Sequence, residues 1–116
     1  MNAFGETRAD YAGKLTAAGL AGVTLDPAAL PPFVLVDLVT VDRASGVGAW
    51  GASLPVKIVV PPPGDAAAAA ELEAALETVL RTLGFAPATP TIYRGADKEC
   101  PAYVVTYPVD VPNPDC

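Results

Sequence analysis

Hydrophobic residues recur at helical spacing near the start of the chain and at strand spacing after it. Phe4, Tyr11 and Leu15 fall on one face of a helix. Gly19 and Gly22 follow this pattern and are predicted to end the helix. The chain therefore opens with a short amphipathic helix, and the longer apolar patterns come afterwards.

Two valine-rich patterns follow, and each predicts a strand. Residues 33–42 are apolar on both faces except at three positions, so we expect this strand to be covered on both sides. Residues 54–60 form a second strand that ends at three prolines, and Pro55 indicates a sheet edge or a bulge near its start. Residues 43–51, between the two patterns, are predicted to form a flexible loop.

The clearest helical pattern covers residues 65–83. Asp65 is predicted to cap its N-terminus by accepting hydrogen bonds from the first turn, and Gly84 ends it. An apolar stripe runs along this helix, and we expect it to be buried against the sheet. The stripe residues with this prediction are Leu72, Leu76, Val79 and Leu83.

Two further strand patterns precede the C-terminus. Residues 91–94 predict a short strand, residues 95–101 a polar turn, and residues 102–109 a last strand. Residues 110–116 contain two prolines and are predicted to be an extended, mobile tail. We therefore expect one α+β domain over residues 1–116, with a mostly antiparallel four-stranded sheet and two helices packed on one face.

Charge and composition narrow the possible functions. The net charge is −6 and only seven residues are Lys or Arg, so sequence-specific binding of nucleic acid is not expected. No apolar run is long enough to span a membrane. The two cysteines, Cys100 and Cys116, are too few for a disulfide scaffold and are predicted to be reduced. The hydrophobic fraction of 52% is high for a small domain and indicates contact with protein partners.

The sequence offers few groups for catalysis or metal binding. Histidine is absent, and no cysteine stands beside a base, so we assign no catalytic residue and no cofactor. Four loop or tail carboxylates lack the spacing of an EF-hand, so we expect them to be solvated and predict no metal site. These are Asp97, Glu99, Asp110 and Asp115.

Three local features have alternative interpretations. Residues 46–51 match G-x-G-x-x-G, which binds dinucleotides only where a helix follows; a strand pattern follows here, so the match is predicted to be accidental. Trp50 either folds back over the sheet edge or anchors a protein interface. Asp37 is either an outward-facing residue or a charge paired with one of three basic residues: Arg43, Lys57 or Arg94.

The order of these elements resembles that of the tail terminator (tail completion) proteins of long-tailed bacteriophages. After an N-terminal helix, residues 30–36 read Leu-Pro-Pro-Phe-Val-Leu-Val. A second strand, 54–60, leads into the Ala- and Leu-rich helix 65–83, and residues 103–107 read Tyr-Val-Val-Thr-Tyr. The proline run at 61–63 and the acidic, proline-rich tail depart from the family's pattern.

The resemblance implies a structural virion protein at the head–tail junction, made in the host cytoplasm. Such a protein caps the tail tube as a homohexameric ring, ends polymerisation of the tail tube protein and binds the head-completion (stopper) protein. DNA would pass through the pore of the ring, and an acidic chain would repel this DNA and not bind it. On this hypothesis the loop 43–51 and the tail 110–116 contact partners. The candidate interface residues are Arg43, Val47, Trp50, Val109 and Val111.

Two other classes remain open at this point. Another head–tail connector, such as a stopper, should have more β-barrel character and less helix than residues 65–83 imply. A small ligand-binding or regulatory α+β domain should have a pocket with convergent polar groups. The mass of the native protein would help to distinguish these classes.

Overall fold

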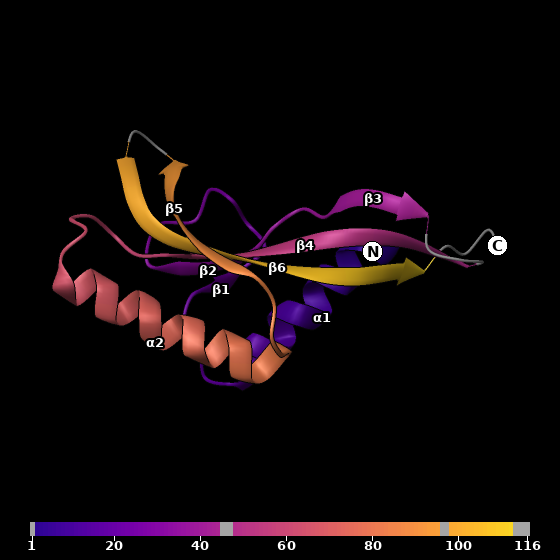
Figure 1. Cartoon of the computed structure of the whole chain (residues 1–116), viewed down its shortest axis with the longest axis horizontal. Helices are drawn as coiled ribbons and strands as arrows, with labels where there is room; N and C mark the ends of the chain where they lie inside the picture. Colours follow the sequence, from indigo (N-terminus) through magenta and orange to yellow (C-terminus); the bar gives the residue numbers. More distant parts are fainter. Residues whose placement is uncertain (1, 45–47, 96–97, 113–116) are drawn as a thin grey trace.

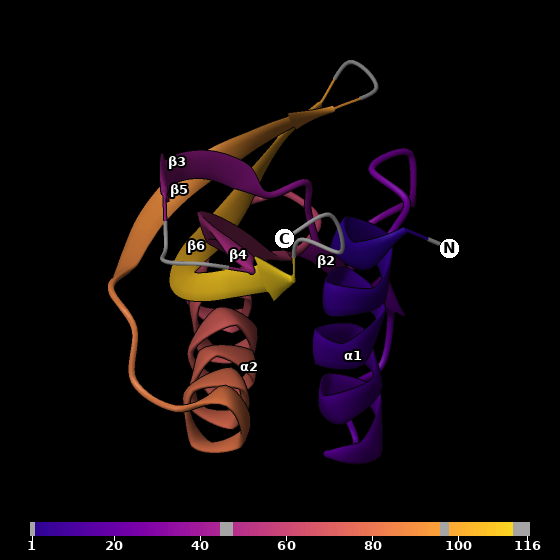
Figure 2. The same cartoon turned by 90° about the vertical axis from the view of Figure 1, so that its right-hand side faces the viewer.

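The structure is a computed structural model that describes residues 2–44, 48–95 and 98–112. Its elements are α1 (Ala3–Ala17), β1 (Val23–Thr24), β2 (Phe33–Val36), β3 (Thr40–Ala44), β4 (Ala49–Val59), α2 (Ala66–Leu83), β5 (Ala88–Gly95) and β6 (Lys98–Pro112). The sheet order is β1-β2-β4-β6-β5, and β3 pairs with β4 outside this path. Both helices lie on one face of the sheet, as Figure 1 and Figure 2 show.

The predicted α+β class is confirmed, but the sheet has six strands rather than four. Four of its five strand pairs are antiparallel, and the β1–β2 pair is parallel. The sheet is therefore mostly antiparallel, as expected. Of the two additional strands, one is β1 and the other arises because the predicted strand 33–42 is divided into β2 and β3.

Both helices begin at a capping side chain. The Asn2 side chain accepts a hydrogen bond from the Gly5 N–H at 2.8 Å, and Asp65 accepts one from the Ala68 N–H at 2.9 Å. At the end of α2, Gly84 has a φ of 92°, and its N–H donates to the Leu80 carbonyl. The cap at Asp65 and the stop at Gly84 were predicted and are confirmed.

The strand predicted over residues 33–42 is interrupted opposite Pro55. β2 and β3 pair with the same edge of β4, and the Asp37 N–H donates to the Pro55 carbonyl at 3.0 Å. Because proline has no N–H, Pro55 cannot return the second hydrogen bond of an antiparallel pair. Pro55 therefore lies within β4, neither near its start nor at a sheet edge, and it faces the gap between β2 and β3.

The two longest strands extend into segments predicted as loop, turn and tail. β4 and β6 pair along the whole of β4, from Ala49 opposite Pro112 to Val59 opposite Ala102. Residues 49–51 and 110–112 are thus strand. Residues 98–101 are strand through pairing with β5, which is also longer than predicted. Local glycines and prolines indicated turns, but pairing with neighbouring strands of the sheet determines the conformation here. The remainder of the predicted loop, 45–47, and of the tail, 113–116, lies outside the described residues.

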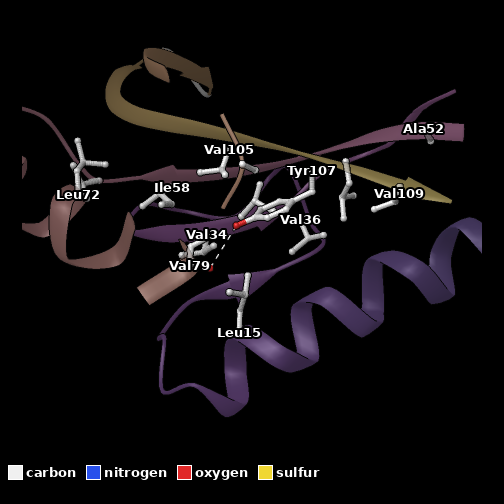
Figure 3. Close-up of a cluster of buried hydrophobic side chains, with 14 of the residues drawn as sticks. Leu15, Val34, Val36, Ala52, Ile58, Leu72, Val79, Val105, Tyr107 and Val109 are labelled. Carbon is white, nitrogen blue, oxygen red and sulfur yellow. Dashed lines mark hydrogen bonds between the residues drawn. The ribbon is translucent and has the colours of Figure 1, made fainter. Parts of the chain in front are cut away.

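The main core lies between the sheet and the two helices (Figure 3). Leu72 and Val79 of the α2 stripe are buried as predicted, whereas Leu76 and Leu83 are half-buried. A smaller apolar cluster lies on the opposite face and includes Phe33. All four residues of β2 are buried, so the predicted cover on both faces is confirmed for residues 33–36. It is wrong for the rest of the predicted strand 33–42, where Leu38 and Val41 are exposed.

Candidate interaction surfaces

An apolar groove of about 410 Å³ lies over the smaller cluster, on the sheet face away from the helices. Residues 27–31 form one wall, Pro61 and Pro62 contribute a second, and the end of the β5–β6 hairpin forms the third. Leu30 lies in this lining with 80% of its surface exposed. Lys98 is the one ionisable amine or carboxylate among the described residues of the lining.

Tyr93 holds the wall of this groove in place. Its hydroxyl donates to the Pro27 carbonyl at 2.9 Å, which ties the segment 27–31 to β5. Its ring meets Phe33 edge to face, with 5.3 Å between ring centroids, and the Lys57 ammonium lies 5.9 Å from the Tyr93 centroid. The groove is thus built on paired strands and ordered contacts.

A second apolar surface lies beside α1. Phe4, Leu25 and Val39 line a shallow depression with the exposed side chains of Leu38 and Val41. Arg8 crosses this area, and its guanidinium donates to backbone carbonyls that include that of Val36, at 3.0 Å. Because the hydrogen bond to Val36 joins its guanidinium to the backbone of β2, Arg8 connects α1 to the sheet.

Phe85 is the most exposed large hydrophobic residue of the described chain, at 89%. It follows the residue that ends α2, where an apolar side chain usually packs back against the last turn. The sequence therefore gave little sign that this ring would be exposed. The groove was equally hard to anticipate, because its walls come from three separate segments.

The candidate interface residues gather at one end of the sheet, but they do not form one exposed surface. Pairing places Trp50 opposite Val111, and Ala52 opposite Val109. Val109 and Val111 are buried in the main core, at 7% and 0% exposure, so their side chains face the chain's own interior. Val47 lies outside the described residues.

Trp50 folds back onto the chain. It belongs to β4, and its ring stacks on that of Phe4, with 5.4 Å between centroids and 17° between planes. Of the two interpretations of Trp50, this stacking agrees with the one in which the ring folds back over the sheet. Residues 49–51 of the glycine motif are strand and no helix follows them, so the dinucleotide interpretation of this motif fails.

Arg43 is exposed, and its side chain extends across Gly51. A Cβ added at Gly51 would come within 2.2 Å of the Arg43 Cγ, so the glycine provides the space for this side chain. The Arg43 guanidinium pairs with the Asp42 carboxylate at 2.6 Å, and Asp42 also accepts from the Ser53 hydroxyl. Arg43 thus belongs to a polar cluster on β3 and β4.

Asp37 is a paired charge, one of the two interpretations that the sequence left open. Its carboxylate lies 2.8 Å from the Lys57 ammonium and also accepts from the Leu38 N–H. Burial alone would raise the pKa of Asp37, but the hydrogen bonds from Lys57 and Leu38 and the charges of Lys57 and Arg8 hold this pKa below its usual value. The pair joins the end of β2 to β4.

No group of three His, Cys, Asp or Glu side chains suited to a metal ion occurs within residues 2–44, 48–95 and 98–112. Glu99 pairs with Arg94 at 3.4 Å, and Asp97 and Asp115 lie outside the described residues. Cys100 is a buried free thiol, whereas Cys116 is not described. The helices of the described chain are too short or too polar to cross a membrane.

Comparison with known proteins found no protein-family model that matches this chain and no curated protein that matches its sequence. The structure itself defines a small α+β chain with a buried core, an apolar groove and separate exposed apolar side chains.

Proposed function

We propose that this chain is a structural subunit of a phage head–tail junction, which assembles as a hexameric ring on the tail tube, ends tube growth and joins the tail to the head. The observation that carries the proposal is the presence of separate apolar surfaces on one small chain: the groove at Leu30, the projecting Phe85, and the depression at Leu38 and Val41. Such exposed apolar surface marks sites of protein contact.

A ring subunit needs several distinct contact surfaces. Each copy touches two neighbours through two different surfaces, because a ring of more than two copies requires heterologous contacts. It must also bind the tail tube protein on one side of the ring and the stopper on the other. The separate apolar surfaces and the order of elements shared with the tail terminators support this role. The net charge of −6 suits a pore through which DNA passes without binding.

A small-molecule binding role has weaker support. The groove volume falls within the usual range of ligand pockets, but such pockets also have several polar groups placed for recognition. Here the Tyr93 hydroxyl already donates to Pro27, and Lys98 is the one charged group among the described lining residues. An apolar lining of this kind fits a protein side chain better than a polar metabolite.

Deletion of the gene in a phage that carries it tests the proposal, with the wild-type gene supplied from a plasmid as the control. We expect tails of uncontrolled length without heads, and the plasmid should restore normal particles. Electron micrographs give both tail length and head attachment. Tails of normal length that lack heads would favour the stopper class, and normal, head-joined tails would refute a role at the junction.

The symmetry of the assembly provides a second test. Averaged images of tail ends that carry the protein should show a six-fold ring, because a cap must match the symmetry of the tube it ends. A ring of another symmetry, or none, would contradict the hexamer. The free protein's native mass is a separate question, since a terminator that stays monomeric in solution can still assemble on a tube.

A further inference from the structure

We propose that the Phe85 side chain of one copy inserts into the apolar groove of a second copy, so that neighbours associate head to tail. This inference rests on the proposed function, because it names the contact that joins neighbours in the ring. The occupant of the groove is thus a second copy of this chain. Four observations support it: the fixed position of Phe85, the relative location of the two features, the apolar lining, and the charges beside them.

Phe85 is exposed but is held between two anchored residues. On one side, the Gly84 N–H donates to the Leu80 carbonyl, and the Gly84 carbonyl accepts from the Tyr107 hydroxyl, both at 2.9 Å. On the other side, Ala86 is buried at 3% exposure. The backbone at Phe85 is therefore fixed while its ring points into solvent. A ring presented in this way loses little conformational freedom on binding, which favours affinity.

Phe85 and the groove belong to opposite ends of α2. Pro61 and Pro62 of the groove precede the helix, whereas Phe85 follows its C-terminus, and a helix of 18 residues is about 27 Å long. In Figure 2 the segment after α2 lies at the bottom, and the β5–β6 hairpin that borders the groove rises at the top. Phe85 cannot reach the groove of its own chain, so its insertion into a groove joins two copies. Such a contact is heterologous and generates a ring when the rotation closes.

The chemistry of the two surfaces is complementary. The groove offers Ala28, Leu30 and prolines to an aromatic ring, and large aromatic residues are the side chains that most often anchor protein interfaces. Lys98 lines the groove, and Phe85 lies next to the C-terminal carbonyls of α2, which carry the negative end of the helix dipole. The last turn of α2 also contains Arg81, whose charge is paired with Glu77. Insertion of Phe85 therefore brings Lys98 of one copy towards the helix-dipole end of the next, beside a cation that is already paired.

Cysteine cross-linking tests this contact directly. In a Cys116→Ser background, Pro87→Cys protein, which keeps Phe85, is mixed with Ala28→Cys protein under mild oxidation at high protein concentration. Both positions are exposed, so the substitutions should preserve the fold, which circular dichroism can verify. We expect the mixed disulfide dimer to form faster than either homodimer, and a ladder that stops at six copies when one chain carries both cysteines. Leu38→Cys, at an exposed apolar position away from Phe85, replaces Pro87→Cys in the control mixture.

The outcomes separate this contact from the proposed function. If Pro87→Cys links to Ala28→Cys no better than Leu38→Cys does, the contact is refuted whatever ring the tails carry. A disulfide that forms faster between two Pro87→Cys chains than in the mixture would also refute it, because it indicates a symmetric dimer. If the expected cross-link forms but gene deletion leaves tails normal, the contact stands and the junction role fails.

Two further substitutions test the apolar character of the contact. Phe85→Asp should reduce the protein's self-association, measured at high concentration in an analytical ultracentrifuge, by at least about tenfold, as expected for a central interface aromatic. Phe85→Leu keeps an apolar side chain and should retain most of the association. Equal association for the two variants would contradict an apolar insertion.

Discussion

Replacing Tyr107 with phenylalanine tests how the end of α2 is attached to the sheet. The Tyr107 side chain is 4% exposed in the main core, and its hydroxyl donates to the Gly84 carbonyl at 2.9 Å, with the Val79 carbonyl 3.5 Å away (Figure 3). Tyr107→Phe keeps the ring and removes this hydrogen bond. We expect the free energy of unfolding to fall by about 1 kcal/mol. The loss should not be larger, because Gly84 is exposed and its carbonyl can accept a hydrogen bond from water in the variant.

The same substitution should change the response to alkaline pH. Burial and the nearby Tyr11 raise the pKa of Tyr107 to about 12, from an ordinary value of 10.0. Between these values the unfolded chain loses the Tyr107 proton while the folded chain keeps it, so the folded state becomes less stable as pH rises. This contribution to stability is complete below pH 10 and disappears towards pH 12. Tyr107→Phe removes the titrating group, so the difference between the two proteins should shrink over this range.

Urea unfolding at pH 7 and at steps between pH 9 and about 11.5, followed by far-ultraviolet circular dichroism, measures both effects. Tyr103→Phe, on the same strand and half-buried, is the control at pH 7 and should be less destabilised. A loss below about 0.3 kcal/mol for Tyr107→Phe at pH 7 would show that the bond to Gly84 contributes little. A stability difference that stays constant through the alkaline range would refute the raised pKa.

Substitutions in three other parts of the structure can be tested by denaturant unfolding. Leu72→Ala should cost about 2–5 kcal/mol, and Leu76→Ala clearly less because Leu76 is half-buried; equal costs would contradict this placement of α2. Asp37→Asn should lose up to about 1 kcal/mol at neutral pH, and this difference should fade as pH falls below 3.8, since the lowered pKa stabilises the fold only while Asp37 is ionised. Gly51→Ala should destabilise the fold, and Arg43→Ala should relieve part of this cost in the double variant; strictly additive losses would exclude the close approach.

Local patterns predicted the helices well and the strands less well. The α2 helix follows from signals within its own sequence: the cap at Asp65, the spacing of apolar residues and the stop at Gly84. The end of β4 depends on two partner strands, because Ala49–Gly51 pair with Asp110–Pro112, far along the chain, and Trp50 and Gly51 also pair with β3. Glycine and proline in these segments indicated turns, and the local pattern did not show which strands would pair with them.

The candidate surfaces were harder to predict than the fold. Leu30 directly precedes two prolines in the sequence. Tyr93, which also lines the groove, lies over 60 residues away and contacts Pro27 through one hydrogen bond. Exposure of Phe85 depends on how Gly84 and Ala86 are fixed, which sequence periodicity does not show. Val109 ends the predicted last strand and Val111 lies in the predicted tail, and both were assigned to an interface; β6 instead continues through them, paired with β4, and both are buried.

The pairing of β4 with β6 has a consequence for how the chain folds. These central strands are about 40 to 60 residues apart in sequence, so their contact requires closure of a long loop before it can stabilise anything. The α2 helix and the β5–β6 hairpin lie in or beside that loop and form through local contacts. We therefore expect them to form early and to shorten the effective loop, with closure of β4 onto β6 limiting the folding rate. Substitutions in α2 and where these two strands meet should therefore mainly slow folding.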